Sequence, residues 1–351
     1  MTRWKNFSLS LLLLMGSLAI SFVIGEAVLR LMGYRGAPES FISNIREVQD
    51  PVVDWRYIPG SEVRLGGLVF KYNRAGFRDV DHEVAKPEGI RRIVVVGDSV
   101  SEGNGVSSQA VFSRALQARL GGGYEVINVA AAGLNTPQEV HLFEREGLQY
   151  KPDLVILNFV LNDIDFYSNL AGQRQYYAEM DKRIGILGIP ISPELKRLLK
   201  SSALIYFLKE RVGHLIDRFS ASSAPQGDFF TSLWSDERNR DKATSGFRRL
   251  SELKQANSFE VVVMIWPLLV DYTAYRFGWI HKWIEEEAQK SGLASIDLLP
   301  GFSKVHYRNL QVAAEDAVHP NELGHAIAAD AFWEWYKAIK TRDAGKREVL
   351  K

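Results

Sequence analysis

Short apolar runs alternate along the chain with stretches whose apolar positions recur at helical spacing. The runs are rich in β-branched residues and lie at 92–96, 125–129, 154–160, 260–265 and 294–298. A strand that is apolar on both faces is typical of a parallel sheet covered by helices. The spacing at 110–120 and 137–148 predicts helices between these strands. The pattern therefore predicts a three-layer α/β/α domain with a five-stranded parallel sheet over residues 91–345.

The N-terminal 29 residues have a different pattern. Arg3 and Lys5 precede an uncharged apolar stretch at 7–25, which is close to the ~20 residues that a membrane-spanning helix needs. The basic flank predicts a cytoplasmic N-terminus, so we expect a single-pass membrane protein whose catalytic domain is periplasmic or at the cell surface. The alternative is a signal peptide that is cleaved near Ala19. Under both interpretations the protein is exported from the cytoplasm.

Two further segments flank or interrupt the predicted sheet. Residues 30–90 are expected to form a stalk or small leading module, in which 62–65 and 68–72 form a β-hairpin around two glycines. The connection at about 165–253 is longer than a strand-helix-strand unit of ~30 residues requires. Apolar positions at helical spacing within 193–219 predict a helical insertion. It either caps the site, lies on the membrane or simply packs on the sheet.

Composition limits the possible partners and chemistry. The formal net charge is +1 and the sequence contains no cysteine. A chain so close to neutral carries no excess of basic residues for nucleic acid, so no nucleic-acid partner is expected. The lack of cysteine excludes disulfides, a thiolate nucleophile, thiolate metal sites and a lipid-modified cysteine anchor.

Polar residues with nucleophilic and acid–base chemistry follow several of the predicted strands or precede the last helix. They are Ser99 in Gly-Asp-Ser, Gly133, Asn162, and the Asp316 and His319 of Asp-Ala-Val-His. In a parallel sheet the loops after neighbouring strands meet at one edge, where ligands bind. A serine hydroxyl needs a base to become a nucleophile, and a histidine oriented by an aspartate supplies one. These residues therefore predict an acyl-transfer site.

Four short motifs carry these residues: one each around Ser99, Gly133 and Asn162, and one with Asp316 and His319. Together they resemble the motifs of the SGNH, or GDSL-type, superfamily of serine esterases and acyl hydrolases. The resemblance implies a flavodoxin-like fold with Ser99, Asp316 and His319 as catalytic residues, and no cofactor or metal. It also implies an oxyanion hole formed by the backbone N–H groups of Ser99 and Gly133 and the side-chain amide of Asn162. The sequence departs from the family pattern at Val160, where the family usually has glycine two residues before the asparagine.

The sequence thus predicts an exported, membrane-anchored serine esterase acting on an acylated small molecule, glycan or lipid. An acetyl ester of an envelope carbohydrate or lipid is the candidate substrate. One alternative with the same residues is an O-acyltransferase that acts on a polysaccharide. A second is a carbohydrate-binding module whose catalysis has lapsed. A third is a two-metal phosphoesterase using Asp98, Asn162, Asp163 and His319, against which His82 and His141 lack ligand-like spacing.

Overall fold

The computed structural model describes residues 2–32, 44–65, 68–165, 226–313 and 316–349, with a few positions between 169 and 211. The chain divides into two compact units. One comprises Met1–Phe41 with Tyr177–Ser222, and the other comprises Ile42–Tyr176 with Ser223–Lys351. The glycine turn at 66–67 and most of the predicted insertion helices at 193–219 lie outside the described residues.

A five-stranded parallel sheet forms the centre of the second unit and confirms the predicted strands. Its order is β6-β5-β7-β8-β9. The strands are β5 (Arg91–Gly97), β6 (Tyr124–Ala130), β7 (Leu154–Phe159), β8 (Glu260–Ile265) and β9 (Ala294–Asp297). Strand β5 pairs in parallel with both β6 and β7, so it lies inside the sheet with its residues buried after Arg91.

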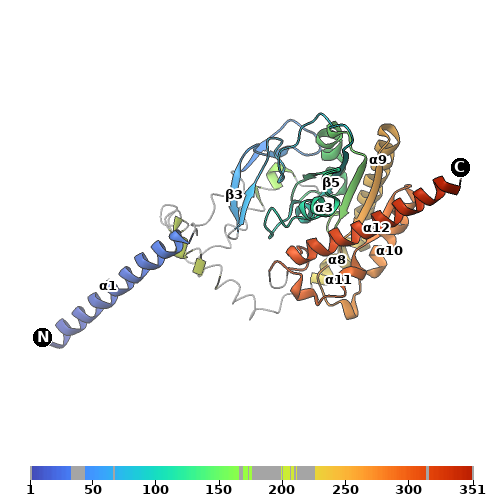
Figure 1. Ribbon diagram of the computed structural model, residues 1–351. Helices are drawn as coiled ribbons and strands as arrows, with labels where there is room; N and C mark the ends of the chain where they lie inside the picture. The colour runs from blue at the N-terminus through green and yellow to red at the C-terminus, as the bar shows by residue number, and fades with distance from the viewer. Residues whose placement is uncertain are drawn as a thin grey trace. The chain divides into compact units, whose positions relative to one another are not determined.

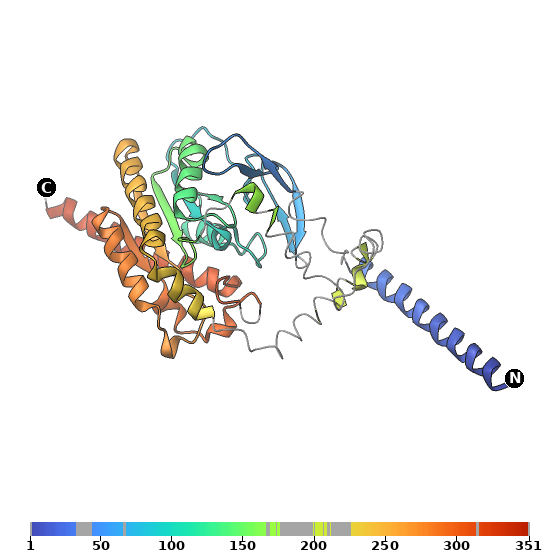
Figure 2. The ribbon, with the colours of Figure 1, turned by 180° about the vertical axis from the view of Figure 1, so that it is seen from behind.

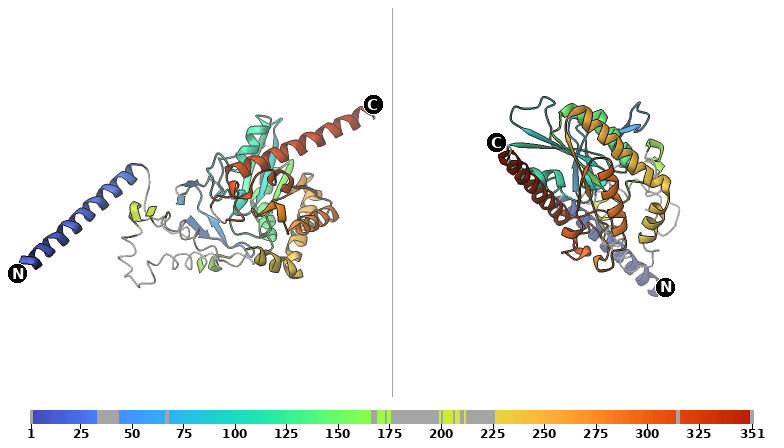
Figure 3. Two further views of the ribbon diagram at one scale, coloured as in Figure 1. Left: turned by 90° about the horizontal axis from the view of Figure 1, so that it is seen from below. Right: turned by 90° about the vertical axis from the view of Figure 1, so that its right-hand side faces the viewer.

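Helices cover both faces of this sheet, as the apolar strands predict (Figure 3). On one face Ile93 and Val95 pack with Phe112 of α3 (Phe112–Leu120) and Phe332 of α12 (Glu322–Val349). On the other face Phe159 packs against Phe247 of α9, with ring centroids 5.6 Å apart. Other helices of this unit in the described part of the chain are α2 (Ser99–Glu102), α4 (Thr136–Leu142), α8 (Gln226–Ser235), α9 (Glu237–Asn257), α10 (Gly278–Lys290) and α11 (Leu299–Phe302).

The predicted helix at 137–148 is shorter in the structure. Helix α4 begins in a capping box at Asn135, ends at Leu142 and continues as a π-helical turn over Phe143–Gly147. A side chain at Gly147 would overlap the ring of Phe143, so the turn closes tightly there. Helix α9 occupies the crossover between β7 and β8, so the long connection ends in a regular sheet-packing helix.

The leading segment forms two small antiparallel sheets. Strand β1 (Ile45–Glu47) pairs with β2 (Trp55–Tyr57), and β3 (Glu62–Leu65) pairs with β4 (Leu68–Lys71), which confirms the predicted hairpin strands. These strands are drawn in blue. In both of two opposite views they lie beside the green and teal part of the same unit (Figures 1 and 2). Aromatic residues of this segment are fully buried, so it packs against the sheet domain as part of one core.

The first unit is built on α1 (Thr2–Leu31). Its part Ser10–Leu31 is long and apolar enough to cross a membrane, a test that a signal sequence also passes. At the C-terminal end of the helix, the Glu26 carboxylate accepts hydrogen bonds from the backbone N–H groups of Ala203 and Leu204 at 3.0 and 2.9 Å. Arg30 donates to the Ser201 carbonyl at 2.9 Å, so this end of α1 is bonded to residues 201–204.

His325 of α12 joins that helix to the start of α3 and generates a stability prediction. Its Nδ1 accepts the Phe112 N–H at 3.2 Å. Burial lowers the pKa of His325 to about 3, and the charges of Arg78 and His319 act in the same direction. Because the unfolded chain binds the proton with an ordinary pKa, stability falls as pH drops from 6.5 toward 3.

We expect unfolding free energy to fall by up to about 1.4 kcal/mol per pH unit below 6.5 through this residue. The His325→Asn variant keeps an acceptor for the Phe112 N–H but does not titrate, so its loss should be smaller. Urea unfolding at about pH 7, 5.5 and 4.5 measures the difference between the two proteins. Equal losses in both would show that His325 is not the group responsible.

Candidate active site

Ser99 lies where β5 ends and α2 begins. The turn is tight, because a Cβ at Gly97 would overlap the Ser101 side chain and approach the Asn158 carbonyl. Asp98 caps α2: its Oδ1 accepts the Val100 N–H at 2.9 Å. The cap leaves the Ser99 hydroxyl at the carboxyl edge of the sheet, with 7% of the residue exposed.

The structure brings Ser99, His319 and Asp316 into one hydrogen-bonded chain. Ser99 Oγ lies 2.9 Å from His319 Nε2, and His319 Nδ1 lies 3.0 Å from Asp316 Oδ2. Asp316 is held in place because its Oδ1 accepts the backbone N–H groups of Val318 and His319 at 3.0 and 2.9 Å. A carboxylate at Nδ1 favours the tautomer with its proton there, which leaves the Nε2 lone pair facing Ser99.

His319 and Asp316 shift each other's pKa. Burial alone would lower the pKa of His319, but the hydrogen bond and charge of Asp316, with the charge of Asp98, raise it above 6.5. Burial would raise the pKa of Asp316, but His319 and the two backbone N–H groups lower it below its usual value. Asp316 is therefore ionised at neutral pH and stabilises a protonated His319.

The predicted oxyanion donors lie around the same strand ends. Among the residues that the structure describes, the backbone N–H groups of Ser99 and Gly133 have no hydrogen-bond partner. Gly133 has φ +79°, a left-handed conformation that favours glycine. The register pairs Ala130 with Gly97, so Gly133 follows on the loop next to the one that carries Ser99. Unpaired N–H groups at this edge are free to bind a developing negative charge.

Asn162 is connected to Ser99 by a shared hydrogen-bond partner, the carboxyl group of Asp98. Its Nδ2 donates to Asp98 Oδ2 at 3.1 Å, and the same oxygen lies 3.2 Å from Ser99 Oγ. Since the amide nitrogen carries two hydrogens, one remains for another acceptor. Val160 does not enter the site, because its side chain packs in the hydrophobic core with Val100 and Trp266.

Sequence reasoning missed two of the buried acidic groups near Ser99, Glu102 and Glu139. Burial and the charge of Asp98 raise the pKa of Glu139 of α4 well above its ordinary value. Burial and the charges of Glu139 and Asp98 do the same for Asp163, whose Oδ2 accepts the Val160 N–H at 2.6 Å. A fourth buried carboxyl, Glu102, lies at the other end of α2. Only Asp98 and Asp163 adjoin predicted site residues; Glu102 and Glu139 carried no signal in the sequence.

His82 and His141, the two histidines without ligand-like spacing, each lie with other acidic partners. His82 pairs with Asp79 and Glu125 at 3.0 and 2.7 Å, and His141 pairs with Asp50 at 2.9 Å. Across the described ranges, no three histidine, aspartate or glutamate side chains are grouped so that they could hold a metal ion.

The GDSL-like lipase/acylhydrolase family matches residues 95–327. The solved structure of TesA is similar over 70% of this chain and 97% of its own, at 15% identity and a TM-score of 0.41. A two-domain esterase active on acetylated mannans is similar over 72% of this chain and 50% of its own, at 12% identity and a TM-score of 0.42.

A putative acylhydrolase from Bacteroides fragilis is similar over 73% of this chain and 92% of its own, at 14% identity and a TM-score of 0.40. No curated protein matches the chain. The family match covers more than half of the sequence and includes every predicted site residue from Ser99 to His319. The chain therefore belongs to the GDSL-like lipase/acylhydrolase family and is an ester-bond hydrolase of the SGNH type.

Proposed function

We propose that the protein is an exported, membrane-anchored serine esterase in which Ser99 is the nucleophile. His319 is the general base and Asp316 orients and stabilises it. The observation that carries this assignment is the continuous chain of hydrogen bonds from Ser99 Oγ through the His319 ring to Asp316. The backbone N–H groups of Ser99 and Gly133, with the amide of Asn162, form the oxyanion hole in this proposal.

The reaction proceeds in two similar halves. Ser99 Oγ attacks the ester carbonyl carbon while His319 Nε2 takes the hydroxyl proton, and Asp316 stabilises the imidazolium that results. The carbonyl oxygen becomes an oxyanion and accepts hydrogen bonds from the free N–H groups. When the tetrahedral intermediate collapses, His319 returns the proton to the leaving alcohol and the acyl group stays on Ser99. A water then attacks the acyl-enzyme by the same route and releases the acid.

The proposed substrate is an acyl ester on an envelope carbohydrate or lipid. Its support is the apolar N-terminal helix, which would tether the domain where such material lies. A panel of p-nitrophenyl esters of rising chain length tests the acyl preference. An acyl acceptor other than water would appear as faster p-nitrophenol release, with transfer product, when an oligosaccharide is added.

Ser99→Ala should abolish ester hydrolysis without unfolding the protein. Loss of the nucleophile in such a triad removes about six orders of magnitude of turnover. Turnover of p-nitrophenyl acetate and labelling by a fluorophosphonate probe measure the effect. Ser107→Ala is the matched control, because the Ser107 hydroxyl bonds to Glu322 in an exposed position. More than a tenth of wild-type turnover in Ser99→Ala would disprove the serine mechanism, and an unlabelled wild-type protein would favour a lapsed binding module.

Asp316→Asn should change the pH profile as well as the rate. In the wild type, kcat/KM should fall as pH drops through the pKa of His319, which Asp316 holds above 6.5. Without the carboxylate that pKa decreases, so the acidic limb should move to lower pH. The plateau should drop by up to about 10⁴-fold, because the correct tautomer is lost. An acidic limb at the same pH in both proteins would assign it to another group.

The membrane proposal predicts that the hydrolase domain is outside the cytoplasm. Protease added to spheroplasts of an expressing bacterium should digest the domain and spare cytoplasmic markers. A double variant, Leu18→Arg with Ile20→Arg, is the control, since each arginine costs about 2.5–3.5 kcal/mol near the centre of a span. In that variant the domain should become protected. Protection of the wild-type domain would reverse the topology, and its release into a periplasmic wash would indicate cleavage near Ala19.

A further inference from the structure

Glu102 is a fully buried carboxyl group at the end of α2, one helical turn from Ser99. Its Oε2 accepts the Ala132 N–H at 2.7 Å and the Tyr57 hydroxyl at 2.8 Å, and its Oε1 accepts the Tyr72 hydroxyl at 2.7 Å. Burial raises the pKa of Glu102, while these donors and the charge of Arg78 oppose the rise. An oxygen at this position accepts the Ala132 N–H in either protonation state.

The bond to Ala132 acts on the residue before Gly133. In the described structure the loop after β6 is tied by two backbone N–H groups, Ala131 to the Gly97 carbonyl at 3.3 Å and Ala132 to Glu102. The second bond is the shorter of the two, at 2.7 Å against 3.3 Å, so the Ala132 N–H is the more closely held. The Gly133 N–H belongs to the planar peptide that joins Ala132 to Gly133. Rotation about Ala132 sets its direction, so this direction depends on how firmly the Ala132 N–H is held.

The two tyrosines come from the leading segment and pack on each other. Tyr57 ends β2 and Tyr72 follows β4. Both are buried, with ring centroids 4.2 Å apart. Arg78 of the same segment donates to the Glu102 carbonyl at 3.1 Å and to the Val106 carbonyl at 2.7 Å. The segment therefore encloses the C-terminal end of the helix that carries Ser99.

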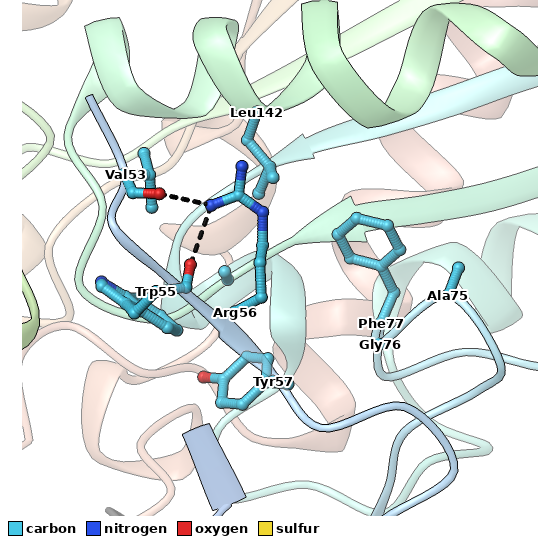
Figure 4. Close-up of a pocket in the computed structure, with 9 residues that line it drawn as sticks. Val53, Trp55, Arg56, Tyr57, Ala75, Gly76, Phe77 and Leu142 are labelled. Atoms are coloured by element: carbon cyan, nitrogen blue, oxygen red, sulfur yellow. Dashed lines mark hydrogen bonds between the residues drawn. The ribbon is translucent and has the colours of Figure 1, made fainter. Parts of the chain in front are cut away.

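A small pocket shows how closely this segment meets the loop (Figure 4). It is lined by Tyr57 and Phe77 of the leading segment together with Ala131 and Leu142. Arg56 closes one side by donating to the Val53 and Trp55 carbonyls at 2.8 Å each, as the dashed lines in Figure 4 show. Ala131, one residue before the N–H that Glu102 binds, thus lines the same pocket as the residues of β2.

We propose that Glu102, held by Tyr57 and Tyr72, is a positioning residue that aims the Gly133 N–H at the oxyanion of the reaction. The leading segment is then part of the catalytic apparatus, although it supplies no group that touches the substrate. This inference rests on the proposed function, because it assumes that Gly133 stabilises the tetrahedral intermediate formed on Ser99. Loss of one oxyanion donor costs about 10²–10³-fold in turnover, which sets the largest effect expected.

The test compares Glu102→Met, which has a similar shape but no oxygen acceptor, with Glu102→Gln, which keeps one. With p-nitrophenyl acetate, Glu102→Met should lose about 10²-fold in kcat while KM changes by less than about threefold. Inhibition by phenylboronic acid, whose tetrahedral adduct on Ser99 resembles the intermediate, should weaken in parallel. Glu102→Gln should recover most of both losses. Active-site titration with a fluorophosphonate limits the comparison to folded protein.

A role in stability alone would lower the melting temperature and leave kcat per titrated site unchanged, and that result would overturn the inference. If Glu102→Met does not fold, the double variant Tyr57→Phe with Tyr72→Phe replaces it. That variant should lose about 3- to 10-fold in kcat at constant KM, since each hydroxyl contributes a modest hydrogen bond. An unchanged kcat would again overturn the inference. Tyr150→Phe, at a buried tyrosine outside this network, is the control and should keep wild-type kcat.

Ser99→Ala is assayed beside these variants. If it is inactive while Glu102→Met keeps its kcat, the positioning role is wrong and the serine mechanism stands. If Ser99→Ala hydrolyses the ester at more than a tenth of the wild-type rate, the serine mechanism is wrong and the positioning role fails with it.

Discussion

Parallel pairing of β5 with β6 on one side and β7 on the other is the constraint on which the site depends. The register sets Gly97 beside Ala130 and Val96 beside Leu157. Because the three strands end at one edge, the loops that carry Ser99, Gly133 and Asn162 are neighbours. A shift of the pairing register by one residue would turn the side chains of β5 to the opposite faces of the sheet. The apolar side chains packed on both faces disfavour such a shift.

Four carboxyl groups are buried near that edge: Asp98, Glu102, Glu139 and Asp163. Asp98 is satisfied by the Val100 N–H, Asn162 and Ser99, and Glu102 by three donors. Neither carboxyl oxygen of Glu139 has a partner among the described residues. Burying a charge without a partner is costly, and a raised pKa keeps the proton on the group instead. The charge of Asp98 also raises the pKa of His319, so the acids beneath the nucleophile influence its base.

The scaffold and the chemical residues were both predictable, for different reasons. Four of the strands were predictable because burial on both faces forces continuous apolar runs. The edge strand β9 is only half-buried, yet it too lies where the pattern placed it. The residues of the proposed site were recognisable because each follows a strand or precedes the last helix in a short block. The end of α4 was not predicted: after Leu142 the chain passes into a π-helical turn, in which the ring of Phe143 leaves no room for a side chain at Gly147.

The sequence by itself determined the layered fold, the family and the set of polar residues at the strand ends, because these depend on local periodicity and short motifs. The tertiary structure alone decided which of those residues bond, and which residues of the leading segment reach Glu102. Tyr57 and Tyr72 lie 45 and 30 residues before Glu102 and read as ordinary aromatic residues of small strands. Their meaning arises only when the chain folds back and places both hydroxyls on one buried carboxyl group, because contacts between distant residues follow from packing and leave no local pattern.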